Sequence, residues 1–126
     1  MTDEVAAYLE KADHALEVAE ALTRDGYAPD AASKTYYAMF YAAQAILRSE
    51  GIEVIKHSAV GSCLGHHFAK SGKIDPEYHK MLLRARKVRE IADYGIEREI
   101  VEPAPALTLE DGKAFVRMAR EYLGVR

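Results

Sequence analysis

One uninterrupted segment, residues 30–48, constrains the fold more than any other part of the chain. Asp30 has a side chain that can cap the start of a helix, and no glycine or proline occurs between residues 31 and 48. The segment therefore predicts a helix of about five turns, at about 3.6 residues per turn. We expect the other elements to pack around this helix.

The expected helix carries two neighbouring stripes of side chains. The first stripe is apolar and predicts the side that faces the core; it comprises Ala32, Tyr36, Phe40, Ala43 and Leu47. In the second stripe every side chain ends in a polar group; it comprises Tyr37, Tyr41, Gln44 and Arg48. Tyrosine rings beside a guanidinium can line a site for a nucleotide or RNA. The commoner use of such tyrosines is half-buried packing with the hydroxyl in water.

Four further helices are expected, and no segment predicts a strand. Residues 3–24 have apolar side chains at helical spacing behind Thr2 as a cap, and Gly26 is expected to close this helix. Ser58 is expected to cap a third helix over residues 59–70, with Gly72 just past its end. The fold class is thus all-α: a single-domain up-and-down bundle of about five helices over residues 1–126.

The last two helices have clear start signals. The pair Asp75-Pro76 places a capping acid before a proline in the first turn, which predicts the start of the fourth helix, and Gly95 is expected to end it. Residues 96–107 contain two prolines and predict an extended connection. Thr108 opens a sequence typical of a capping box, which predicts the start of the fifth helix.

Two glycines, Gly61 and Gly65, lie one turn apart inside the expected third helix. Each costs about 1 kcal/mol relative to alanine in a helix interior. We expect close approach of another backbone at these positions, within the fold or across a dimer interface.

Composition excludes several classes of protein. The apolar runs are far shorter than the roughly 20 residues that span a membrane, so we expect no membrane association. The first residues lack the basic and apolar regions of a signal peptide, and Cys63 is the single cysteine. These features predict a cytoplasmic protein without an internal disulfide.

Charge is unevenly distributed along the chain. Residues 1–30 contain eight acidic side chains against two basic ones, whereas residues 79–89 contain no acid. The basic side chains of the latter segment could contact phosphates, or they could pair with the acidic first helix or with a partner protein. They are His79, Lys80, Arg84, Arg86, Lys87 and Arg89.

Three motifs carry a resemblance to a known family. They are Ala-Ala-Ser-Lys-Thr-Tyr-Tyr-Ala-Met-Phe-Tyr-Ala-Ala at 31–43, Gly-Ile-Glu-Val-Ile-Lys-His-Ser-Ala-Val at 51–60, and Arg-Glu-Ile-Ala-Asp-Tyr at 89–94. In this order and spacing the chain resembles a HEPN domain, the helical nucleotide-binding family of higher eukaryotes and prokaryotes. It is most similar to the short stand-alone prokaryotic type.

The resemblance implies a homodimer and a partner. Proteins of this type are often paired with a minimal nucleotidyltransferase in toxin–antitoxin-like modules, and many HEPN proteins are metal-independent ribonucleases. Their catalytic motif is an arginine followed after four to six residues by a histidine, in which the histidine moves a proton and the arginine stabilises the scissile phosphate. This chain has no such pair, because its last histidine is His79 and only Arg24 and Arg48 precede a histidine.

Three hypotheses about function follow. The first is a non-catalytic homodimer that binds a nucleotide or RNA, with a ligand-binding set of Tyr37, Tyr41, Arg48, His57, Arg89, Asp93 and Tyr94. The alternative is an endoribonuclease that uses His57 with Arg48 or Arg89. A structural module that neutralises a partner is a third use of the same bundle.

No cofactor or metal is expected. Cys63 and His67 are one helical turn apart and His66 is adjacent, so metal ligands could converge there. Without a second cysteine or a carboxylate at ligand spacing, the thiol is expected to be buried as a small apolar group.

Overall fold

The computed structural model describes residues 2–94 and 109–125. These residues form five α-helices and one π-helical turn, and they contain no strand. The elements are α1 (Asp3–Arg24), α2 (Ala28–Ser49), α3 (His57–Leu64), the π-helical turn Gly65–Ala69, α4 (Pro76–Tyr94) and α5 (Leu109–Leu123). The all-α prediction is confirmed.

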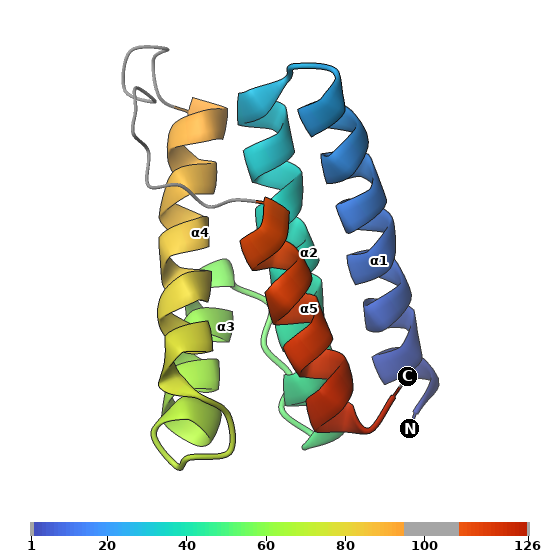
Figure 1. Cartoon of the computed structure of the whole chain (residues 1–126). Coiled ribbons are helices and arrows are strands. Elements are labelled where there is room, and N and C mark those ends of the chain that lie inside the picture. The colour runs from blue at the N-terminus through green and yellow to red at the C-terminus, as the bar shows by residue number, and fades with distance from the viewer. Residues whose placement is uncertain (1, 95–108, 126) are drawn as a thin grey trace.

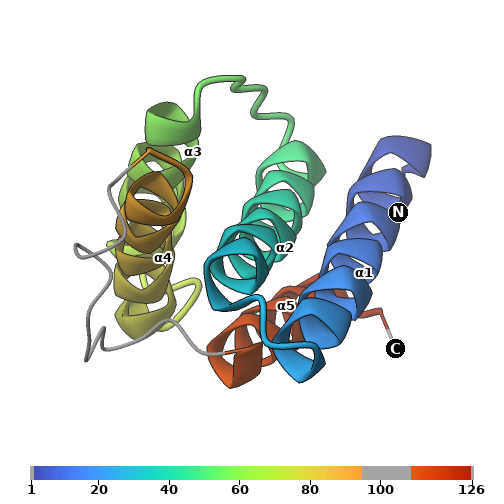
Figure 2. The same cartoon turned by 90° about the horizontal axis from the view of Figure 1, so that it is seen from above.

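Helix α2 occupies the centre of the bundle. Helix α1 packs along one side of it and α4 along the other, while α5 crosses the front of α2 in Figure 1. The view from above in Figure 2 shows that α3 lies beside α4, and that the α2–α3 connection runs on the side of α2 opposite α5. One face of α2 is therefore flanked by α1 and by the α3–α4 pair, without α5 over it.

Burial explains the central place of α2. Tyr36, Phe40, Ala43 and Leu47 of the predicted apolar stripe are buried, and Ala32 is half-buried. Burial also extends well beyond that stripe, because α2 is covered by helices on several sides. The additional buried apolar residues of α2 are Ala31, Ala38, Met39, Ala42, Ala45 and Ile46. Their many small side chains allow neighbouring helices to approach α2 closely.

The helix ends confirm some boundary predictions and correct others. Thr2 caps α1 by accepting a hydrogen bond from the backbone N–H of Val5 at 3.2 Å, and Gly26 after α1 has a positive φ of 87°. Asp30 is not the cap of α2: the cap position is Tyr27, and Asp30 lies within the first turn. The helix starts earlier because Pro29, whose φ already suits a helix, fits within that first turn.

The third helix starts earlier than predicted and changes its hydrogen bonding midway. Ser58 does not cap it, since the cap position is Lys56 and Ser58 lies in the first turn of α3. A π-helical turn then follows from residue 65 to residue 69. Gly72 has the positive φ of 82° expected just beyond this segment.

The two helical glycines face side chains of α4 instead of another backbone. A Cβ at Gly65 would lie 2.5 Å from Nε2 of His79, and a Cβ at Gly61 would lie 3.0 Å from Cδ2 of Leu83. The prediction of a close approach at these two glycines is therefore confirmed, but the approaching groups are side chains and not another backbone. Both contacts are within the chain, and they let α3 pack directly against α4.

Several predictions lie outside the described residues. They concern Gly95 as the end of α4, the extended connection over 96–107, and the capping box that begins at Thr108. The start of α4 is described: the Asp75 carboxylate accepts a hydrogen bond from the backbone N–H of Glu77 at 2.9 Å. Within residues 2–94 and 109–125, no helix is long and apolar enough to cross a membrane.

Candidate functional site

A histidine from the start of α3 lies against aromatic rings of α2. His57 stacks on Phe40 with ring centroids 4.2 Å apart and an interplanar angle of 13°. Its Nδ1 is hydrogen-bonded to the hydroxyl of Tyr36 at 2.8 Å, and the ring of Tyr37 meets it edge-on at 5.7 Å. The imidazole is thus held by stacking on the Phe40 ring and by a hydrogen bond with the Tyr36 hydroxyl.

An arginine from α4 reaches the same tyrosines. Arg89 donates a hydrogen bond from Nη2 to the hydroxyl of Tyr37 at 2.7 Å, and its guanidinium lies 5.3 Å from the centre of that ring. Its Nε pairs with the Asp93 carboxylate at 2.9 Å. Asp93 also accepts a hydrogen bond from Ser33 of α2 at 3.4 Å, so the pair joins the two helices.

These residues form what we call the α2–α4 cluster, which comprises Tyr36, Tyr37, Phe40, His57, Arg89 and Asp93. Desolvation by burial lowers the pKa of His57 below its ordinary value of 6.5, and the positive charges of Arg89 and Arg86 act in the same direction. Desolvation also raises the pKa of Tyr36 to about 12, against the opposing effect of these arginines. At neutral pH the cluster therefore combines an uncharged imidazole and an uncharged phenol with a guanidinium–carboxylate pair.

The lowered pKa of His57 predicts a pH dependence of stability. Because the histidine binds a proton more weakly in the folded state than in the unfolded state, its contribution is present above the unfolded pKa of 6.5 and is lost as the pH falls through the folded pKa. The free energy of unfolding should therefore decrease as the pH is lowered below 6.5. Urea titrations across this range should show a shallower decrease for His57→Gln than for the wild type. Identical slopes in the two proteins would contradict the assignment, and His66→Gln, at an exposed position, serves as the control.

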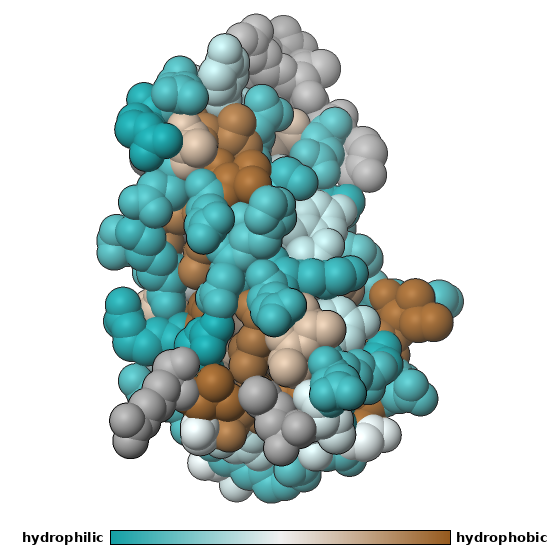
Figure 3. Space-filling model, turned by 90° about the vertical axis from the view of Figure 1, so that its right-hand side faces the viewer, coloured by the Kyte–Doolittle hydropathy of each residue, from teal (hydrophilic) through white to brown (hydrophobic). Residues whose placement is uncertain are grey.

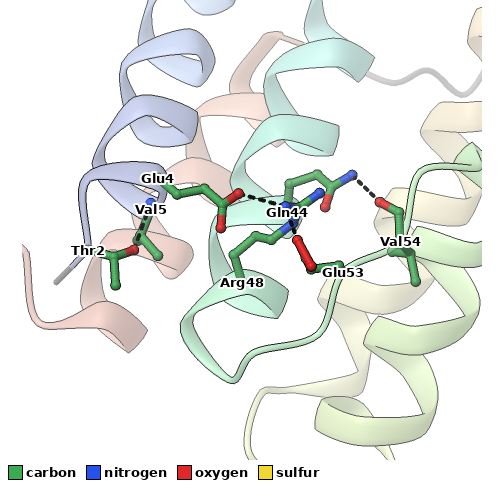
Figure 4. Close-up of polar contacts among 7 residues, drawn as sticks. All are labelled: Thr2, Glu4, Val5, Gln44, Arg48, Glu53 and Val54. Carbon is green, nitrogen blue, oxygen red and sulfur yellow. Dashed lines mark hydrogen bonds and ion pairs between the residues drawn. The ribbon is translucent and has the colours of Figure 1, made fainter.

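Arg48 lies in a different polar network. It donates to Glu4 of α1 at 2.7 Å and to Glu53 of the α2–α3 connection at 3.2 Å, and its guanidinium lies 5.4 Å from the centre of the Tyr8 ring. Figure 4 shows these carboxylates on either side of the guanidinium. None of the contacts described for Arg48 involves His57. The structure therefore does not bring the predicted pair of Arg48 and His57 together.

Tyr41 lies between α1 and the α2–α4 cluster. Its ring lies 6.3 Å from that of Tyr8 and 5.4 Å from Nζ of Lys11. It also contacts two rings of the cluster, those of Phe40 and Tyr37, whose centroids are 5.8 Å and 6.1 Å away. Tyr94 is the last residue of α4, and its side chain lies outside the described part of the chain.

Tyr36 has a second role that the sequence prediction missed. Its position in the apolar stripe predicted a core residue, and it is 1% exposed. Its hydroxyl is nevertheless the partner of His57. Periodicity could not reveal this, because it reports which side of a helix is buried and not what the tip of a buried side chain contacts. The histidine in the motif at 51–60 was the available signal that a polar partner was needed.

The basic segment of α4 does not face the acidic first helix. Helices α1 and α4 lie on opposite sides of α2 (Figure 2). Arg86 pairs with Glu90 at 3.3 Å within α4, whereas Arg84 and Lys87 are exposed. Acidic and basic side chains are thus separated across the bundle.

The thiol and the adjacent histidines of the third helix do not form a metal site in the described residues. No three ligating side chains come together there. Cys63 is half-buried and packs against the core, while His66 and His67 are exposed.

Comparison with known proteins decides the family. The model of the HEPN domain matches residues 5–125. The chain belongs to the HEPN family. Among its relatives is a UPF0332 protein of Gloeobacter violaceus, 32% identical over 124 residues, which cover 98% of each chain. Another is a Methanocaldococcus jannaschii protein named "Putative toxin", 32% identical over 120 residues, which cover 95% of this chain and 82% of the relative. A UPF0332 protein of Pyrococcus horikoshii is 32% identical over 83% of this chain and 74% of its own.

The α2–α4 cluster is built from residues of the HEPN-like motifs. The motif residues His57, Arg89 and Asp93 of this HEPN chain come from two separate helices, α3 and α4, and the fold brings them around Tyr36 and Tyr37 of α2. Arg48, which lies between the first two motifs in the sequence, is outside the cluster. In this HEPN protein, the histidine and the arginine that share a site therefore come from α3 and α4.

Proposed function

We propose that this HEPN protein is a non-catalytic homodimer that binds a nucleotide unit, above all within single-stranded RNA, and partners a minimal nucleotidyltransferase in a toxin–antitoxin-like module. The observation that supports RNA binding is the α2–α4 cluster, in which a guanidinium and an uncharged imidazole are held on a platform of aromatic rings. The name of the Methanocaldococcus relative supports the toxin–antitoxin context.

The chemistry of the cluster suits RNA. Aromatic rings and guanidinium groups stack with bases of any sequence, and a guanidinium also attracts the phosphate. The contacts to Tyr37 and Asp93 fix the position of Arg89 before a ligand binds, and the hydrogen bond from Tyr36 does the same for His57. Such preorganisation reduces the entropy that is lost on binding.

The uncharged state of the histidine also has a role in this proposal. Since the Tyr36 hydroxyl keeps its proton at neutral pH, it can donate to Nδ1 and leave the imidazole hydrogen on Nε2. That hydrogen can be donated to a phosphate oxygen or to a base. Protonation of the imidazole is unnecessary for such a contact.

RNA binding is tested by fluorescence anisotropy with a labelled single-stranded RNA of mixed sequence. We expect binding that weakens with salt, with a slope of about 0.7 for each phosphate contacted in a single strand. A duplex DNA of the same length is the control for general attraction to phosphates. Absence of binding at low salt, or an equal affinity for the duplex, would contradict this part of the proposal.

A metal-independent endoribonuclease is the second candidate. The observation that favours it is the combination, in one cluster, of an uncharged histidine and an arginine, the two residue types that HEPN nucleases use. With Arg89 stabilising the phosphate, His57 would exchange a proton with the ribose 2′-hydroxyl. This candidate predicts RNA cleavage that survives EDTA and is lost in His57→Ala. Lack of cleavage by the wild type, or cleavage that persists in the variant, would exclude it.

A further inference from the structure

An isoleucine between α2 and α3 is held in an exposed position. Ile55 is 86% exposed. On one side, the carbonyl of Val54 accepts a hydrogen bond from Nε2 of Gln44 at 2.9 Å. On the other side, two residues further along the chain, His57 is hydrogen-bonded to Tyr36. Figure 4 shows Gln44 reaching from α2 to Val54. The segment is thus fixed on both sides of Ile55, and the exposure of this apolar side chain follows from the fold.

A groove of about 490 Å³ lies between α1 and α2. Small apolar side chains and two tyrosine rings form most of its walls, and charged groups stand among them. Its lining includes Glu10, Lys11, Val18, Lys34, Tyr37 and Tyr41. In Figure 3, which looks onto the α1 side, hydrophobic surface is visible between the hydrophilic side chains.

The groove and the exposed isoleucine belong to the same side of the bundle. Asp13 and Glu20 of α1 pair with Arg120 and Lys113 of α5, and so they mark the side of α1 that faces α5. Lys11 is two residues before Asp13, which is about 200° around a helix, so the groove side of α1 is turned away from α5. The α2–α3 connection also lies on the side opposite α5 (Figure 2).

The charges around the two features are complementary. The segment that carries Ile55 has an acid before it, Glu53, and a base after it, Lys56. The groove has an acid, Glu10, and two bases, Lys11 and Lys34. Among the described residues, no ion pair involves Lys11, Lys34 or Lys56. Glu53 is 72% exposed even though it contacts Arg48, so it can approach a further cation.

We infer that a second copy of this chain docks on this side, with the Ile55 of each copy inserted into the α1–α2 groove of the other. The arrangement is a twofold, isologous interface in which Lys56 faces the Glu10 of the other copy and Glu53 faces its Lys11 and Lys34. This inference rests on the homodimer in the proposed function and names its surface. Since Tyr37 lines the groove and also holds Arg89, each α2–α4 cluster then lies beside the other copy.

Light scattering after size-exclusion chromatography tests the interface. At micromolar concentration we expect a dimer for the wild type and a monomer for Ile55→Asp. The control is Tyr27→Asp, at an exposed aromatic position just before α2 that does not line the groove, and it should remain dimeric. A monomeric wild type, or an Ile55→Asp protein that is still dimeric, would overturn the inference. Far-ultraviolet circular dichroism checks that each variant is folded.

Cysteine cross-linking tests the register directly. In a Cys63→Ser background, the variant Ile55→Cys/Val18→Cys should form intermolecular disulfides on mild oxidation, and each single variant should form far fewer. Equal cross-linking of the single and double variants would overturn the proposed insertion. RNA binding is measured on the same proteins. A dimer that survives Ile55→Asp contradicts this interface alone, a monomeric wild type also contradicts the proposed homodimer, and a dimer that binds no RNA contradicts only the RNA proposal.

Discussion

Arg89→Gln is expected to weaken the binding of single-stranded RNA by about tenfold or more and to reduce the salt slope of binding by about 0.7. The guanidinium is the cation of the α2–α4 cluster that is fixed by Tyr37 and Asp93, and its side chain is only 15% exposed. Glutamine keeps much of the apolar stem but cannot supply the charge. Anisotropy titrations at several salt concentrations measure both effects.

Lys87→Gln is the matched control for this prediction. Lys87 is two residues before Arg89 on α4, about 200° around the helix, and it is exposed. If general attraction between the basic helix and phosphates were responsible for binding, both variants would lose affinity equally, and the cluster would not be the site. Thermal unfolding of each variant shows whether the fold is retained, because Arg89→Gln also leaves Asp93 without its ion pair.

Phe115→Ala is expected to lower the free energy of unfolding by about 3–5 kcal/mol. The ring is fully buried, and it meets Tyr78 of α4 edge-on with centroids 6.2 Å apart. The ring thus joins α5 to α4 within the core. Removing the ring leaves a cavity that the surrounding helices cannot fill completely. Urea unfolding followed by circular dichroism measures the decrease in the free energy of unfolding.

Phe115→Leu is the graded comparison for this core position. Leucine retains most of the apolar volume, so the loss should be well below that of the alanine variant. Equal losses for the two variants would show that the effect does not come from the cavity. A loss below about 1 kcal/mol for Phe115→Ala would contradict the described packing of α5 against the core.

Helix positions were largely predictable from the sequence, because they depend on local signals. Apolar periodicity located α1 and α2, Asp75-Pro76 located the start of α4, and Gly26 and Gly72 marked helix ends. The errors occurred where two local signals competed. Asp30 and Ser58 both resemble caps, yet each lies inside a first turn, since the chain had already adopted helical geometry before it.

The composition of the site was less predictable, because it depends on which helices become neighbours. The sequence suggested His57, Arg89, Asp93 and Tyr37, and the structure brings these four together. It could not show that Arg48 would be held by Glu4 and Glu53, residues from two other segments. Nor could it show that Tyr36, a core residue by periodicity, would bond to the histidine.

Nuclear magnetic resonance of the ring nitrogens and ring protons during titration with single-stranded RNA tests the central claim most directly. The claim predicts that the signals of His57 and Tyr37 shift as the RNA is added, and that the signals of exposed His66 and His67 do not. RNA binding that shifts only signals on the outer face of α4, while His57 and Tyr37 stay unchanged, would contradict the assignment of the α2–α4 cluster as the binding site.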